Sequence, residues 1–155
     1  PVKKETGRRK NLTQTGQTPN QITRKFAPGS QWLFFKIYCG YKTAERVLSD
    51  VISDFIESGL KKHLFDHFFF IRYSDPHPHL RIRFFNTDIK KQKKVQADLL
   101  KILQPFIDND MIESVVLDTY VRELERYGED IIEDTELVFF NDSLARIRIS
   151  KLLDP

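Results

Sequence analysis

Two arginines separated by a single residue, Arg81 and Arg83, stand near the end of the stretch 67–85, which reads HFFFIRYSDPHPHLRIRFF. In a strand alternate residues share a face, so these two guanidinium groups would lie side by side. A guanidinium group presents a planar fork of N–H donors that holds a carboxylate or a phosphate through paired hydrogen bonds. Arg72 and Arg122 add two further cations that we place on the same surface. The pattern indicates an anion-binding site.

The same arginines also have a structural explanation, which the sequence leaves open. They would then form ion pairs across the sheet with Asp118, Glu123 and Glu125. The run RELERY is equally ambiguous, because in a helix its two arginines, Arg122 and Arg126, share a face and alternate with acids.

Other reactive side chains give weaker signals. His77 and His79 alternate near the turn, but zinc needs three or four ligands and no second cluster exists, so we predict no metal site. We interpret His63 and His67 as capping or surface residues, and Cys39 as an inert thiol in the core. A Gly-rich phosphate loop, a Ser-His-Asp pattern and an HExxH motif are all missing from the sequence.

Four strands are predicted from aromatic and β-branched runs that alternate in polarity. They cover residues 32–39, 68–73, 79–85 and 113–121. With helices between the first and second and between the third and fourth, the order is strand, helix, strand, strand, helix, strand. This order predicts the fold class α+β: a ferredoxin-like βαββαβ fold, with a four-stranded antiparallel sheet, helices on one face and extra C-terminal helices.

The helices follow from apolar residues at helical spacing. The first is predicted to begin at Thr43 and to stop at Gly59, and the second follows the capping run 86–88, with Ile89 on its inner side, and bends or ends at Pro105. After Gly128 the spacing is helical again. The run Asn141-Asp142-Ser143 then predicts a cap between two C-terminal helices.

Alternation along each strand predicts which residues share a face of the sheet. Toward the helices we place Leu33, Phe35, Ile37, Cys39, Phe69, Ile71, Tyr73, Leu80, Ile82, Phe84, Val115, Leu117, Thr119 and Val121. On the opposite face we place Trp32, Phe34, Lys36, Tyr38, Phe68, Phe70, Arg72, Arg81, Arg83, Phe85, Val116, Asp118, Tyr120 and Arg122. This second face is too apolar to lie bare in water and too charged for an ordinary core. We expect it to be covered by the last helices, another domain, a second copy or a substrate.

Composition divides the 155-residue chain into a tail and one domain. Residues 1–25 hold seven Lys and Arg against one Glu, whereas the rest holds 18 basic and 21 acidic residues. Residues 1–27 are therefore predicted to be a flexible basic linker, with phosphate contacts to nucleic acid as the alternative, and residues 28–155 an α+β domain. The sequence shows no signal peptide and no membrane span, and its one cysteine suits a reducing, cytoplasmic compartment.

Three motifs together resemble a known family. IRYSDPHPHLRIRFF, with GSQWLFFKIYCG before it and LDTYVRELERYGE after it, looks like the lantibiotic dehydratase C-terminal domain. This is the glutamate-elimination domain, also called the thiopeptide-type bacteriocin biosynthesis domain. The motifs occur in the family's order and cover about residues 28–142, and their combination is specific.

The resemblance implies an activity. Members of the family remove glutamate from glutamylated Ser or Thr of a precursor peptide, leaving dehydroalanine or dehydrobutyrine. It implies Arg81, Arg83 and Arg122, in the HLRxR and YxREL motifs, as catalytic residues, and we assign Arg72, Asp118, Tyr120 and Arg126 to substrate binding. The family also uses a distal histidine, and none of the four His lies there, so we expect the catalytic set of this piece to be incomplete.

The implied partners are the precursor peptide, a glutamylation domain or protein that uses glutamyl-tRNA, a cyclase, and a second copy in a homodimer. No cofactor and no direct nucleic-acid contact are expected of this chain. Two alternatives stay open: a non-catalytic peptide-binding or docking module of a bacteriocin biosynthesis complex, and a related enzyme that forms a pyridine ring by cycloaddition.

Overall fold

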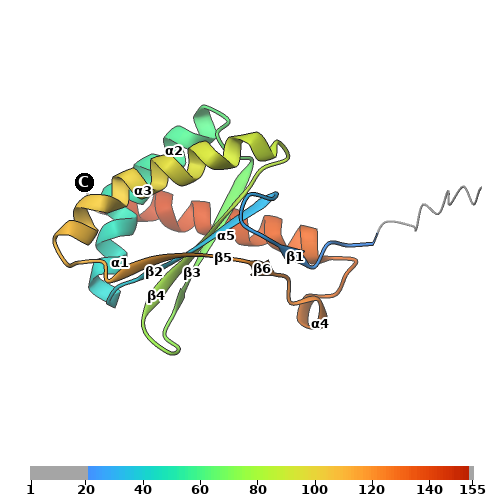
Figure 1. The fold of residues 1–155 in the computed structure, drawn as a ribbon. Helices are drawn as coiled ribbons and strands as arrows, with labels where there is room; N and C mark the ends of the chain where they lie inside the picture. The colour runs from blue at the N-terminus through green and yellow to red at the C-terminus, as the bar shows by residue number, and fades with distance from the viewer. Residues whose placement is uncertain (1–20, 154–155) are drawn as a thin grey trace, which may run out of the picture.

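Four strands form one antiparallel sheet in the order β3-β4-β2-β5, and helices pack against it (Figure 1). The computed structural model describes residues 21–153, so most of the predicted linker lies outside the described residues. The strands are β1 (Lys25–Phe26), β2 (Trp32–Tyr38), β3 (His67–Tyr73), β4 (His79–Phe85), β5 (Ser114–Asp118) and β6 (Tyr120–Val121). The helical elements are α1 (Tyr41–Val47), η1 (Leu48–Ile52), α2 (Ser53–Lys61), η2 (Ile89–Lys91), α3 (Gln92–Asp108), α4 (Leu124–Tyr127) and α5 (Ile132–Leu153). The predicted mixed α+β class and antiparallel sheet are confirmed.

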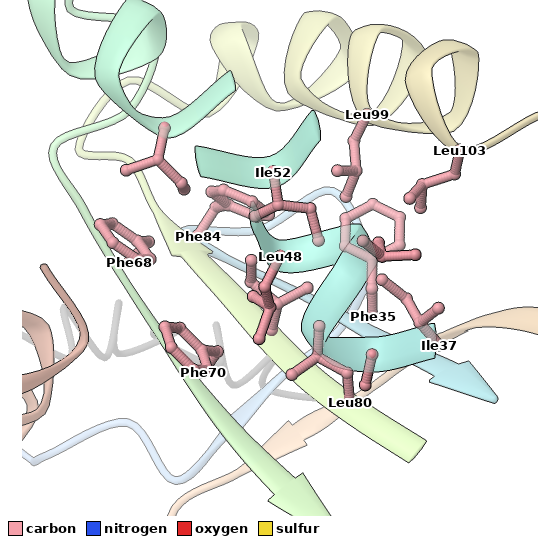
Figure 2. Packing of buried hydrophobic residues seen from close by; sticks show 14 of the residues in the cluster. Phe35, Ile37, Leu48, Ile52, Phe68, Phe70, Leu80, Phe84, Leu99 and Leu103 are labelled. Carbon is pink, nitrogen blue, oxygen red and sulfur yellow. The ribbon is translucent and has the colours of Figure 1, made fainter. Parts of the chain in front are cut away.

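The main core lies between the sheet and the layer formed by α1, η1, α2 and α3. Figure 2 shows side chains from β2, β3 and β4 meeting others from η1 and α3. Phe84 is fully buried and packs edge-on against Phe35 and Phe65 at ring-centroid distances of 6.3 and 5.0 Å. Burial of such large rings contributes about 1.5–3 kcal/mol each. None of the helices described between residues 21 and 153 combines the length and the apolar character needed to cross a bilayer.

The first helical stretch differs from its prediction at both ends. It begins at Tyr41, after the N-cap Gly40, rather than at Thr43, and it contains the π-helical turn η1. Gly59 lies inside α2, and the residue with left-handed backbone after the helix is His63, with φ 55°. Gly59 is instead explained by close packing, because a Cβ atom there would lie 2.3 Å from Cε1 of Phe65.

The second helical stretch starts as predicted but ends later. Asp88 caps it, because its carboxylate accepts a hydrogen bond from the N–H of Lys90 at 3.0 Å. Ile89 is 51% exposed, so its predicted inward position was wrong. Pro105 lies within α3, which continues to Asp108. A proline removes one helix hydrogen bond, and the buried apolar side of α3 outweighs that loss.

The predicted faces are correct for β2 and β4 but wrong for β3. Phe68 and Phe70 pack in the main core. Phe69 lies on the second face, where it pairs with Arg83 of β4. Arg72, paired with Leu80, therefore lies on the helix side. The run of three phenylalanines carries no alternation, so strand pairing decides which of them enters the main core.

The second face is covered by the chain itself. The predicted fourth strand breaks at Thr119 into β5 and β6, and β6 pairs with β1 instead of extending the four-stranded sheet. This pairing buries Phe26 against Tyr120, which in turn packs against Trp32, so residues before the predicted boundary at residue 28 pack with the domain.

Helix α5 completes the cover and protects the edge of the sheet. It packs against β3, where Ser143 Oγ accepts a hydrogen bond from the N–H of Phe70 at 3.1 Å. A sheet edge with unpaired N–H groups invites aggregation, and this contact satisfies one of them. The predicted cap at residues 141–143 was wrong, because α5 runs without a break from Ile132 to Leu153.

A candidate anion-binding site of arginines and aromatic rings

A cavity of about 220 Å³ opens on the face of the sheet opposite α3. Aromatic rings and charged groups line it: Phe34, Phe69, Tyr120, Tyr127 and Phe139, with Lys36, Arg81, Arg83, Asp118 and Glu123. The strands place Arg81 and Arg83 there because both are on the same side of β4. Four predicted site residues thus meet in one cavity: Arg81, Arg83, Asp118 and Tyr120.

Arg83 is enclosed by three rings. Its guanidinium carbon lies 4.1 Å from the ring centroid of Phe34 and 4.9 Å from those of Phe69 and Tyr120. The residue is 8% exposed, and its Nε and Nη1 are buried with no hydrogen-bond partner among residues 21–153. Burial lowers the pKa of Arg83 to about 10, so it remains a cation at neutral pH. A buried cation without a partner is costly, and an anion in the cavity would relieve that cost.

Arg81 lines the same cavity as Arg83. Its guanidinium carbon stacks 3.8 Å from the ring centroid of Tyr73, and its Nε donates to Nε2 of His79 at 2.9 Å. A guanidinium group has five N–H donors, and this bond uses the one on the chain side. The terminal amino groups are the ones that grip a carboxylate side by side with a second arginine.

Asp118 makes the rim of the cavity mixed in charge. Lys36 Nζ lies 2.8 Å from its carboxylate, and the N–H of Thr119 donates to it at 2.7 Å. The hydrogen bond from Lys36 is the largest cause that lowers the pKa of Asp118, ahead of the opposing effect of burial. Asp118 is therefore ionised at neutral pH, which suits contact with an amide N–H rather than with an anionic ligand.

Arg122 is buried beside this cavity and does not line it. Its Nη2 and Nε donate to the carboxylate of Glu136 at 2.6 and 3.2 Å, and its Nη1 donates to the carbonyl of Thr23 at 3.0 Å. Tyr120 Oη donates to the same carboxylate at 3.0 Å. Burial, followed by the charge of Glu136, raises the pKa of the Tyr120 phenol. Arg122 therefore acts on the cavity indirectly, through Glu136 and Tyr120.

Glu136 is a site residue that sequence reasoning missed. It is 2% exposed and is the acceptor that joins Arg122 to Tyr120. Glu136 was not among the residues that the sequence analysis assigned to a site. The helical spacing from the buried Ile132 to Glu136 was the signal that could have found it, because residues four apart share a face.

Two predicted binding residues lie elsewhere. Arg72 forms an ion pair with Glu45 of α1, on the helix side of the sheet, so its placement beside the other arginines was wrong. The error in its prediction follows from β3, whose residues face the side of the sheet opposite to the predicted one. Arg126 has a side chain 72% exposed and lies 3.7 Å from Glu123 in a surface ion pair.

The arrangement can bind a carboxylate and stabilise negative charge. Arginine does not remove protons at neutral pH, so the described cations supply binding and charge stabilisation rather than base catalysis. Between residues 21 and 153 no three His, Cys, Asp or Glu side chains gather in a way that could hold a metal ion.

Comparisons with known proteins agree on one family. The family model for the lantibiotic biosynthesis dehydratase C-terminus matches residues 32–154. The subtilin biosynthesis protein SpaB of Bacillus subtilis is 34% identical over 131 residues, and the nisin biosynthesis protein NisB of Lactococcus lactis subsp. lactis is 30% identical over 121 residues. These matches cover 82% and 77% of this chain but 12% of each relative.

A solved structure has the same fold. The tRNA-dependent lantibiotic dehydratase MibB from Microbispora sp. 107891 matches with a TM-score of 0.69 and 27% identity, over 81% of this chain and 12% of that one. The chain thus spans about an eighth of the length of the relatives it matches. The resemblance seen in the three motifs is confirmed: the chain belongs to the lantibiotic biosynthesis dehydratase C-terminal family.

Proposed function

We propose that this chain forms part of a lantibiotic dehydratase and eliminates glutamate from glutamylated Ser or Thr of a precursor peptide. The observation that carries the proposal is Arg83, a cation enclosed by three rings at the cavity, with two buried N–H-bearing nitrogens that have no partner in the described part of the chain. Arg81 reaches the same cavity from the same strand. A glutamyl group brings the carboxylate that such a pair binds.

The reaction breaks two bonds of the modified residue. A base takes the proton from Cα, the electron pair left behind forms the Cα–Cβ double bond, and the Cβ–O bond breaks as glutamate leaves with a new carboxylate. Negative charge develops on the carbonyl oxygen next to Cα and on the departing carboxylate. One arginine would hold the glutamate and the other would stabilise the developing charge; loss of such a donor costs about 2.7–4 kcal/mol.

The remaining roles follow from the geometry. We propose that Asp118 and Tyr120 contact the peptide at the cavity wall, because both line it. Arg122 would act by fixing Glu136, which in turn orients Tyr120. Arg126 would meet the peptide at the surface. The base for the α-proton would come from another part of the enzyme.

Further parts of the proposal concern fold and context. The order β3-β4-β2-β5 places β4 between β2 and β3. We assign this sheet, with its helices, to the ferredoxin-like split βαβ arrangement. The partners would be the precursor peptide and a glutamylation domain that uses glutamyl-tRNA, in the cytoplasm, with no cofactor bound by this chain.

The test uses the full-length protein, the precursor peptide and mass spectrometry. Arg81→Ala, Arg83→Ala and Arg83→Lys should accumulate glutamylated peptide while glutamylation itself continues, because a lysine cannot reproduce the planar fork that the rings enclose. The variant Arg122→Ala should show a similar loss. Arg72→Ala is the matched control, since this arginine lies on the other side of the sheet.

The outcomes separate the alternatives. If the variants of Arg81 and Arg83 dehydrate the peptide at the normal rate, the arginines are structural or belong to a docking module, and the proposal is wrong. If glutamylation stops instead, the cavity serves the other half-reaction.

A further inference from the structure

We infer that His79 is a positioning residue for Arg81: its imidazole accepts the Nε–H of Arg81 and holds the guanidinium group in the orientation that meets the substrate carboxylate. The inference rests on the proposed role of Arg81. It concerns the motif HLRIR itself, in which the histidine two residues before the first arginine shares its face of β4. The sequence alone had suggested only a weak metal ligand there.

The two partners of His79 fix which ring nitrogen carries the proton. Arg81 Nε lies 2.9 Å from His79 Nε2, and a guanidinium N–H can only donate, so Nε2 must be an acceptor. His79 Nδ1 lies 2.8 Å from the carbonyl oxygen of His77, which can only accept, so Nδ1 must carry the hydrogen. Together these contacts require a neutral imidazole protonated on Nδ1.

Neighbouring strands hold this imidazole rigidly. His79 is 3% exposed and stands in register between Tyr38 of β2 and Tyr73 of β3. Its ring centroid lies 4.7 Å from that of Tyr38 and 5.6 Å from that of Tyr73. Arg81 stacks on the same Tyr73 ring at 3.8 Å. The arginine is thus fixed by one ring contact and one directed hydrogen bond.

Such fixing matters because a free arginine side chain has many rotamers. Ordering it when the substrate arrives would cost binding free energy, whereas a side chain already in place loses less. The hydrogen bond uses the chain-side N–H, so the terminal amino groups are left to meet a ligand in the cavity that Arg81 and Arg83 line.

The arrangement depends on the acceptor that His79 offers at Nε2. The groups that face its ring are Tyr38 from β2, Tyr73 from β3, the His77 carbonyl and Arg81. A glutamine in place of His79 keeps an oxygen acceptor for the Nε–H of Arg81, whereas a phenylalanine keeps only a ring.

The experiment measures elimination by the full-length protein from a peptide that has already been glutamylated, as kcat and KM. His79→Phe keeps a ring between the tyrosines but has no acceptor, whereas His79→Gln offers its side-chain oxygen near the position of Nε2. We expect His79→Phe to lose about 10- to 100-fold in kcat/KM, the size of a lost hydrogen bond to a charged group. His79→Gln should stay within about threefold of the parent. His77→Phe is the matched control, because His77 is exposed and enters the network only through its backbone carbonyl.

A double variant shows whether His79 acts through Arg81. In the Arg81→Ala background, His79→Phe should have no further effect on kcat/KM. Additive losses in kcat/KM in the double variant would overturn the positioning role, and so would equal losses in His79→Gln and His79→Phe. A normal rate in His79→Phe would also overturn it if Arg81→Ala is impaired. If Arg81→Ala eliminates glutamate normally, the proposed function of the cavity fails instead. Unchanged thermal unfolding of each variant confirms that the fold is intact.

Discussion

The ion pair between Arg122 and Glu136 should be the most sensitive point of the second face. Glu136 accepts three hydrogen bonds, two from Arg122 and one from Tyr120, and both charged residues are at most 4% exposed. Glu136→Gln keeps the shape of the side chain but removes its charge and leaves one acceptor oxygen. Breaking a buried ion pair from one side costs about 3–5 kcal/mol, because the remaining charge stays buried without compensation.

The expected effect is local, since the pair joins β6 to α5 and, through Thr23, to the segment before β1. Hydrogen exchange with mass spectrometry on the full-length protein should show amides of residues 120–127 and 132–143 exchanging about 10²- to 10⁴-fold faster. Glu133→Gln, on the exposed side of the same helix, is the control and should change exchange by about twofold at most. An acceleration below about tenfold in Glu136→Gln would refute the reasoning. Replacing Arg122 and Glu136 together by methionine should recover most of the protection, because no buried charge is then left alone.

Three further outcomes are expected. Gly59→Ala should lower the stability of α2, measured by hydrogen exchange, by about 1–2 kcal/mol, because the clash with the enclosed Phe65 ring exceeds the gain in helix propensity. In a Phe65→Leu background the same substitution should stabilise α2 instead. Arg72→Ala should leave elimination unchanged in the peptide assay, because its ion pair lies on the helix side; accumulation of glutamylated peptide would contradict the observed phase of β3. Burial lowers the pKa of His67 in the folded protein, so the unfolded chain binds a proton at His67 more tightly. Protection of the β3 amides from hydrogen exchange should therefore fall as the pH drops below about 6.5. His67→Phe should abolish that dependence, and equal pH dependence in both proteins would contradict the assignment.

The sequence by itself determined the strands β2, β3 and β4, the antiparallel sheet and the family. Alternation in β4 is clear, because polar and apolar residues change places at each step from His79 to Phe84, and it correctly set Arg81 and Arg83 on one face. The motifs around these strands also carried the family resemblance, which the match over residues 32–154 confirms. Local patterns suffice for such features because each depends on a few consecutive residues.

Tertiary structure decided the surroundings of the arginines. The phase of Phe68-Phe69-Phe70 has no local signal, so only pairing with β4 sends Arg72 to the helix side. The split of the fourth strand depends on β1, which is about a hundred residues away in sequence and removes β6 from the main sheet. Helical spacing could place Glu136 on the buried side of α5, but its pairing with Arg122 depends on the first half of α5 packing beside the second face. What surrounds a charged side chain is set by contacts between distant segments, and those contacts made Arg122 a buried ion pair while leaving Arg83 enclosed by rings beside an open cavity.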